Sequence, residues 1–152
     1  MNNFKLIIRK ESLCIESNDV IGVICFSIDD WYFPGENWDD FVATILSWLS
    51  HALVKINFKK EREVEVDFME GCFKVTFILD VENLCTIQFI EGEKLSGDEE
   101  IIHKTITVPF EDVKSEVKKA CELLLHMKET KELDFEEDYE KLKESYELLC
   151  KC

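Results

Sequence analysis

The chain has 152 residues, of which 46% are hydrophobic and 34% charged, and its formal net charge is -15. A chain of this length buries about 70% of the surface that its unfolded form exposes, so its core needs neither a metal nor a disulfide. The hydrophobic content excludes an intrinsically disordered protein. The negative charge disfavours nucleic acids and anionic membranes as partners, and favours a basic protein surface.

The sequence predicts neither export nor membrane insertion. The aliphatic group at residues 6–8 is too short for a signal-peptide core. The most apolar stretch, residues 20–28, is about half of the roughly 20 residues that a membrane helix needs. Seven cysteines without a C-x-x-C pair favour reduced thiols, and Cys150 and Cys152 are treated as incidental. We therefore expect a cytoplasmic protein.

Apolar and polar residues alternate with the period of a β-strand in several segments. One of them, residues 20–28, is apolar on both faces and is typical of a covered central strand. The predicted strands cover residues 4–8, 13–15, 20–28, 63–68, 73–79, 84–90 and 101–108.

Helical periodicity begins after the turn at Pro34-Gly35. Asn37 is a suitable N-cap, so a helix is predicted to start at Trp38, with Asp39 and Asp40 in its first turn. Its predicted buried arc comprises Trp38, Phe41, Val42, Ile45, Leu46, Trp48, Leu49, Ala52 and Leu53.

Two further helices are predicted near the end of the chain. The first runs from residue 110 to near Thr130, and the second starts at Asp134, where Glu137 completes a capping-box pattern. The second carries an apolar stripe of Phe135, Tyr139, Leu142, Tyr146 and Leu149. The whole chain, residues 1–152, is therefore predicted to be one α+β domain. Its antiparallel sheet has about seven strands in the order βββ-α-ββββ-αα, with helices packed on it.

No pattern in the chain names a reaction. His51, His103 and His126 lack the spacing of zinc ligands or of a nucleophile's base, and the five glycines form no phosphate loop. We expect no catalytic residue, no metal site and no cofactor. An acid–base hydrolase stays open, because among 33 carboxylates some pair always lies close in space.

Two acidic segments are the candidate binding residues. Residues 29–40 contain five carboxylates and no base, with aromatic residues between them, and residues 91–100 add five carboxylates against one lysine. Aromatic anchors and negative charge together favour a protein interface. Core packing, helix capping and a solvated loop are the alternatives. The predicted contacts are Asp29, Asp30, Trp31, Tyr32, Glu36 and Asp40, with Glu91, Glu93, Glu99 and Glu100 as a second group.

Residues 31–41 read WYFPGENWDDF, and residues 45–49 read ILSWL. This stretch of roughly 20 residues resembles a segment of bacterial immunity proteins encoded beside polymorphic toxins, although Leu49 stands where a second aromatic residue is expected. The resemblance implies a non-enzymatic cytoplasmic antidote that binds the toxin domain of a contact-dependent or secreted effector. Many such toxins are nucleases with basic clefts.

A second hypothesis belongs to another class of protein. The stripe that includes Tyr139, Tyr146 and Leu149 is also suitable for a regulatory or scaffold domain that self-associates or docks a cytoplasmic partner. The oligomeric state stays open, a homodimer included.

Overall fold

The computed structural model describes residues 3–58, 61–92 and 99–152. Within these residues the chain forms nine strands and three α-helices, with a short 3-10 turn at Lys10–Ser12. The elements are β1 (Phe4–Ile8), β2 (Cys14–Glu16), β3 (Asp19–Ile28), β4 (Trp31–Phe33), β5 (Asp39–Phe41), α1 (Val42–Phe58), β6 (Glu63–Asp67), β7 (Phe73–Leu79), β8 (Leu84–Glu91), β9 (Ile101–Pro109), α2 (Phe110–Glu129) and α3 (Tyr139–Cys150).

The strands form two antiparallel sheets, which confirms the α+β class and corrects the prediction of about seven strands in one sheet. In the first sheet β3 pairs with β1, β2, β4 and β5, and the second sheet has the order β6-β7-β8-β9. Both β1 and β4 pair with residues 26–28, and both β2 and β5 pair with Ile21. Because β3 is paired along both edges and covered by α1, nearly all of it is buried.

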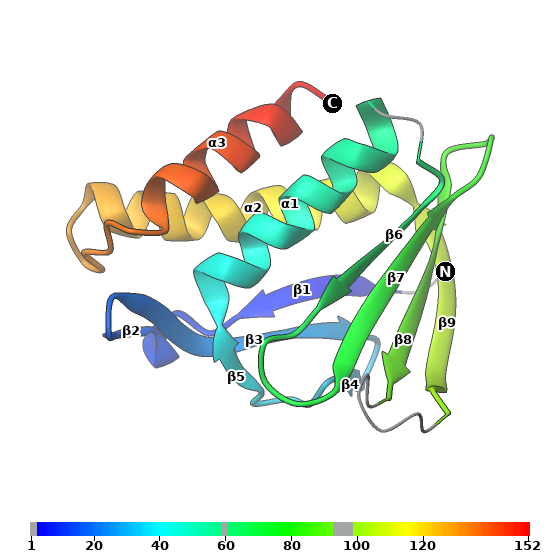
Figure 1. Ribbon diagram of the computed structural model, residues 1–152, viewed down its shortest axis with the longest axis horizontal. Helices are drawn as coiled ribbons and strands as arrows, with labels where there is room; N and C mark the ends of the chain where they lie inside the picture. The colour runs from blue at the N-terminus through cyan, green and yellow to red at the C-terminus, as the bar shows by residue number, and fades with distance from the viewer. Residues whose placement is uncertain (1–2, 59–60, 93–98) are drawn as a thin grey trace.

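The helices lie together on one side of the sheets (Figure 1). Helix α1 packs against β3 of the first sheet and β6 of the second, whereas α2 packs against β1 and the β8–β9 end. Helix α3 packs on α1 and α2 and forms the outermost layer. Helix α1 therefore links the two sheets.

Aromatic side chains fill the junction between the two sheets. The rings of Phe26 on β3 and Phe89 on β8 lie 5.7 Å apart, and Phe33 on β4 lies 5.3 Å from Phe89. Phe68, which follows β6, lies 6.1 Å from both Phe26 and Phe33. These contacts are edge-to-face, the arrangement that the charge distribution of aromatic rings favours. All four rings are buried, so they set the position of one sheet against the other.

The first helix begins at Val42, four residues later than predicted. Residues 39–41 instead form β5, which pairs with residues 21–23 of β3. Asp40 is 1% exposed, and its carboxylate accepts hydrogen bonds from Trp38 Nε1 (2.9 Å) and from the amides of Phe41 (2.7 Å) and Glu70 (3.2 Å). Pairing with the open edge of β3 satisfies backbone groups that a helix start leaves unpaired, which explains the difference.

The last helix begins at Tyr139, five residues later than predicted. Asp134 does not cap it, because its carboxylate accepts a hydrogen bond from Lys128 at the end of α2. Phe135 is buried beside Tyr139, at a ring distance of 5.9 Å. Residues 134–138 therefore bring the chain back onto the core before the helix starts.

We predict that Asp40→Ala lowers the free energy of unfolding by about 3 kcal/mol, because three partly buried donors lose their acceptor. Thermal or denaturant unfolding measures this change. Asp39→Ala, at the exposed neighbouring position, is the matched control and should stay within about 0.5 kcal/mol of the wild type. Equal stability of the two variants would contradict the structural role of Asp40.

Candidate functional site

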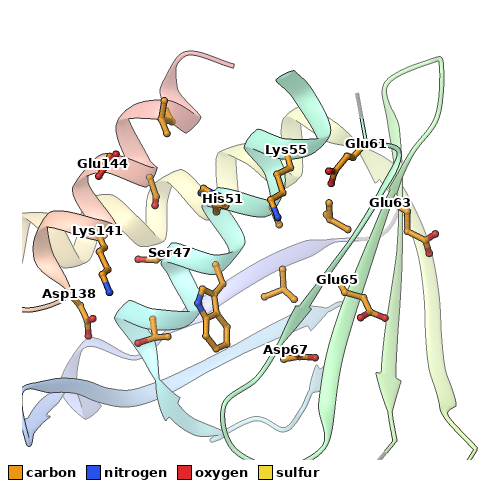
Figure 2. A pocket seen from close by; sticks show the side chains of 17 residues that line it. Ser47, His51, Lys55, Glu61, Glu63, Glu65, Asp67, Asp138, Lys141 and Glu144 are labelled. Atoms are coloured by element: carbon orange, nitrogen blue, oxygen red, sulfur yellow. The ribbon is translucent and has the colours of Figure 1, made fainter. Parts of the chain in front are cut away.

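A groove of about 920 Å³ lies between α1, β6 and α3 (Figure 2). Helix α1 forms its floor, and the groove is lined from this helix by Ser47, Trp48, His51 and Lys55. Strand β6 and Glu61 before it form one wall, and residues 138–148 of α3 and its N-cap form the other. Two consecutive elements, α1 and β6, therefore meet the distant helix α3 around one open cavity.

Carboxylates dominate the lining of this groove. Among the described residues that line it, six are carboxylates and two are lysines, Lys55 and Lys141, so with a neutral histidine their summed charge is -4. Among the described residues, Glu65 pairs with Lys74 (2.8 Å), whereas Glu61, Glu63 and Glu144 have no ion pair within 4 Å. The groove thus presents negative charge that the chain's described cations do not balance.

Asp138 shows the electrostatic character of the α3 wall. Partial burial raises the pKa of the Asp138 carboxyl, and the negative charge of Asp19 raises it further, whereas Lys141 lowers it. Its Oδ2 atom is shielded from solvent and has no hydrogen-bond partner among the described residues. A positive group placed beside Asp138 would stabilise the ionised form, so this wall suits a cationic ligand.

Trp48 lies on the floor of the groove with 41% of its surface exposed. The sequence analysis placed it on the buried arc of the helix, and this was wrong. Thr44, Trp48, His51 and Lys55 follow one another at a four-three-four spacing, so they share the polar face of α1. The sequence already shows this spacing, but the apolar character of tryptophan led to the assignment of Trp48 to the buried side of the helix. A half-exposed tryptophan in a cavity is a typical interface anchor.

The structure brings the start of the first predicted acidic segment, residues 29–33, beside Glu91 at the start of the second. The Trp31 ring on β4 lies 5.3 Å from the Phe89 ring, and the Lys104 ammonium lies 5.3 Å from the centre of the Trp31 ring. The His103 ring on β9 lies 6.4 Å from the Phe33 ring. Its Nε2 atom forms a hydrogen bond of 2.8 Å with Glu91 Oε1. These contacts place β4 beside the end of β8 and the start of β9. Asp29 and Asp30 are exposed in the turn just before Trp31.

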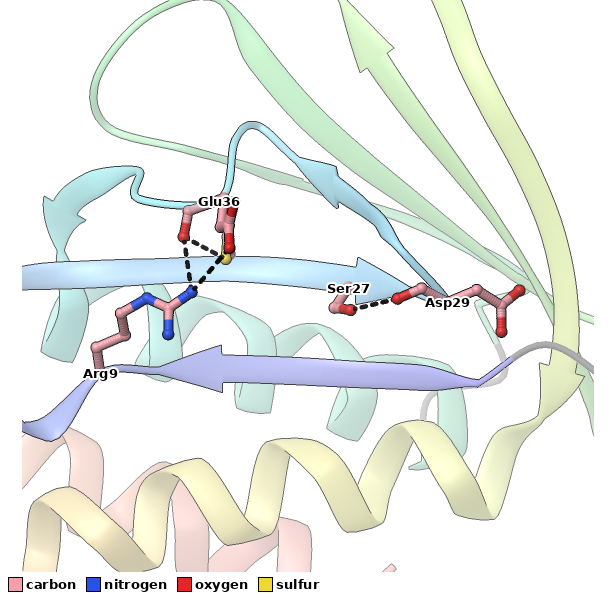
Figure 3. A network of polar contacts seen from close by, with 5 residues as sticks. Arg9, Ser27, Asp29 and Glu36 are labelled. Atoms are coloured by element: carbon pink, nitrogen blue, oxygen red, sulfur yellow. Dashed lines mark hydrogen bonds and ion pairs between the residues drawn. The ribbon is translucent and has the colours of Figure 1, made fainter.

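The chain's own groups occupy much of this predicted surface. Arg9 Nη2 lies 3.9 Å from the Glu36 carboxylate and donates to the Glu36 carbonyl at 3.3 Å (Figure 3). Asp29 lies at the other end of β3, where its carboxylate accepts from the Asn3 amide and its carbonyl accepts from Ser27 Oγ. Glu36 and Asp29 are therefore separated along β3, and each has internal partners.

The remaining predicted contacts have different outcomes. Asp40 is buried and fully engaged, which corrects its assignment as a partner contact. Glu100 accepts from Lys74, and Glu99 is exposed. Glu93 lies outside the described residues. Trp31 and Tyr32 are half-buried, so core packing accounts for part of the aromatic cluster, as the alternative interpretation proposed.

Three thiols and a serine are buried in the core. Burial raises the pKa of Cys25 to about 11, and of Cys85 and Cys121 to about 12. Ser50 Oγ lies 3.3 Å from Cys121 Sγ and donates to the Leu46 carbonyl. These thiols stay protonated near neutral pH, and a protonated thiol is a poor nucleophile and a poor metal ligand. Within the described ranges no group of three His, Cys, Asp or Glu side chains is arranged to hold a metal ion.

Comparisons with protein-family models, curated proteins and solved structures find no match to this chain. In the part of the chain that the structure describes, none of the helices combines the length and the apolar character that crossing a membrane requires.

We predict that iodoacetamide at about pH 8 labels Cys14, Cys72 and Cys150 in the folded protein and spares Cys25, Cys85 and Cys121, because the thiolate is the reacting form. Peptide mass spectrometry measures the labelling. Labelling after denaturation is the control, in which all seven cysteines should react. Rapid labelling of Cys121 in the folded state would contradict the described core.

Proposed function

We propose that this protein is an immunity protein that binds and neutralises a cognate bacterial toxin domain with a basic surface. The observation that carries the proposal is the negatively charged groove between α1, β6 and α3, with Trp48 exposed on its floor. A cavity with an aromatic anchor and unbalanced charge is suited to a protein partner of opposite charge. The resemblance of residues 31–49 to immunity proteins supports the same function.

The proposed mechanism is competition for a basic site. A toxin that cleaves nucleic acid needs cationic side chains where the phosphates bind. The carboxylates of Glu61, Glu63 and Glu144 would pair with those side chains and keep phosphates out. The net charge of -15 adds long-range attraction, which increases the association rate at low ionic strength.

The scaffold hypothesis has less support from the packing of α3. Leu142 and Leu149 are completely buried, and the hydroxyl of half-buried Tyr146 donates to Glu122 at 2.7 Å. The predicted stripe therefore packs on α1 and α2, and a scaffold partner would need another surface of α3.

The first test is capture of the partner. The tagged protein is used as bait in a lysate of its source cells and washed at low and then high salt, and bound proteins are identified by mass spectrometry. We expect a stoichiometric basic domain that high salt releases. Capture of a second copy of this chain alone, or of an acidic partner, would contradict the proposal.

We predict that Glu63→Lys combined with Glu144→Lys lowers the association rate with the captured domain by about tenfold at low ionic strength, and less at high salt. Stopped-flow or surface-based kinetics measures this rate. Asp112→Lys with Glu129→Lys is the matched control, because it makes the same charge change at exposed positions of α2 outside the groove. An equal loss in both double variants would point to net charge rather than to the groove.

We predict that Trp48→Ala mainly raises the dissociation rate, by roughly tenfold or more, because it removes a central anchor and leaves the charges in place. Thermal unfolding should change little, because Trp48 is already half-exposed. Asn57→Ala, at an exposed position of α1 outside the groove lining, is the control for truncation of a side chain on this helix. Unchanged dissociation of Trp48→Ala would remove Trp48 from the interface.

A further inference from the structure

Strand β6 is an edge of the second sheet, because it pairs with β7 alone. Two hydrogen bonds define which of its backbone groups face β7. The Phe68 amide donates to the Phe73 carbonyl at 3.0 Å, and the Leu79 amide donates to the Arg62 carbonyl at 2.9 Å. Hydrogen-bonded pairs alternate along an antiparallel ladder, so the even-numbered residues from 62 to 68 face β7. The amides and carbonyls of Glu63, Glu65 and Asp67 therefore point away from the sheet.

This open edge borders the groove. Each residue from Glu63 to Asp67 lines the cavity, and α1 stands across from them. Among the described residues, no backbone hydrogen bond to the amide or carbonyl of Glu63 or Glu65 is found outside the sheet. The edge carries neither a proline nor a bulge, the devices that commonly block the addition of a strand. It is therefore accessible to an added strand from the groove side.

The side chains of β6 specify what such a strand must carry. The Glu63 and Glu65 carboxylates lie at the outer rim of the groove and point away from α1 in Figure 2, whereas Val64 and Val66 are buried on the side of the core. A second copy of β6 would place carboxylates against carboxylates, which is unfavourable. A favoured strand would carry basic residues on the outer face, beside Glu63 and Glu65. Its apolar residues would point toward α1 and Trp48, on the same side as Val64 and Val66.

We propose that β6 receives an extended segment of the basic partner, in which Lys or Arg alternates with apolar residues, as an additional antiparallel or parallel strand in the groove. This inference rests on the proposed function and specifies how the partner is held. Backbone hydrogen bonds to the outward amides and carbonyls of Glu63 and Glu65 supply affinity, and the alternating side chains supply selectivity.

The probe is a synthetic peptide of alternating lysine and valine, about eight residues long, which is somewhat longer than β6. Its control is the same peptide N-methylated on a central Lys-Val pair, which blocks hydrogen bonding on both edges of the strand and keeps the charge. We expect the first peptide to slow hydrogen exchange of the Glu63 and Glu65 amides in NMR spectra of the full chain, and the control to leave them unchanged. Equal protection by both peptides, or none by either, would overturn the inference.

The matched protein variants are Glu65→Pro and Glu65→Gln. Both substitutions remove the carboxylate and its ion pair with Lys74. Only proline also removes the outward amide of residue 65, and the ladder with β7 stays intact because it does not use that amide. We expect Glu65→Pro to bind the peptide and the captured domain at least about fivefold more weakly than Glu65→Gln. Glu63→Pro against Glu63→Gln repeats the comparison at the first strand residue, where proline is tolerated best. Circular dichroism verifies folding.

The outcomes separate the two proposals. If the proline and glutamine variants bind the captured domain equally while Glu63→Lys with Glu144→Lys still slows association, strand addition is wrong and the charged groove stands. If the charge reversal has no effect on the captured domain, the proposed function itself is wrong.

Discussion

The two sheets are held against each other by the packing of four buried rings at their junction, those of Phe26, Phe33, Phe68 and Phe89. These rings set the second sheet beside the first, and α1 can then contact β3 and β6 at once. Because the rings are buried and meet edge-to-face, the angle between the sheets is set by side-chain packing rather than by backbone hydrogen bonds. The β6 wall of the groove has its position for that reason.

Charge has two distinct roles in this chain. Where a carboxylate meets internal donors it stabilises the fold, as Asp40 does with Trp38 and two backbone amides. In the groove, Glu61, Glu63 and Glu144 have no such ion pair among the described residues. Burying an unbalanced charge is costly, so these side chains stay at an open surface, where they can attract a cation.

The groove combines three means of recognition that act at different distances. Net negative charge acts over many ångströms and affects the encounter with a basic partner. Trp48 supplies apolar contact area once the partner has arrived. The outward backbone groups of β6 act only at hydrogen-bond distance and require an extended partner segment. The acidic residues on the same strand disfavour pairing between two copies of the chain, so the features that favour a basic strand also limit self-association.

Local sequence pattern was enough to predict most of the elements, because the periods of strands and helices are local properties: the α+β class, the predicted strands and the second helix up to Thr130 are present in the structure. The pairing of residues 39–41 with β3, the exposure of Trp48 and the contact between Glu91 and His103 could not be predicted in this way. Each depends on which other element lies beside the residue, and the local pattern carries no information about that neighbour. The groove was beyond sequence reasoning for the same reason, since one of its walls is α3, which is far along the chain from α1 and β6.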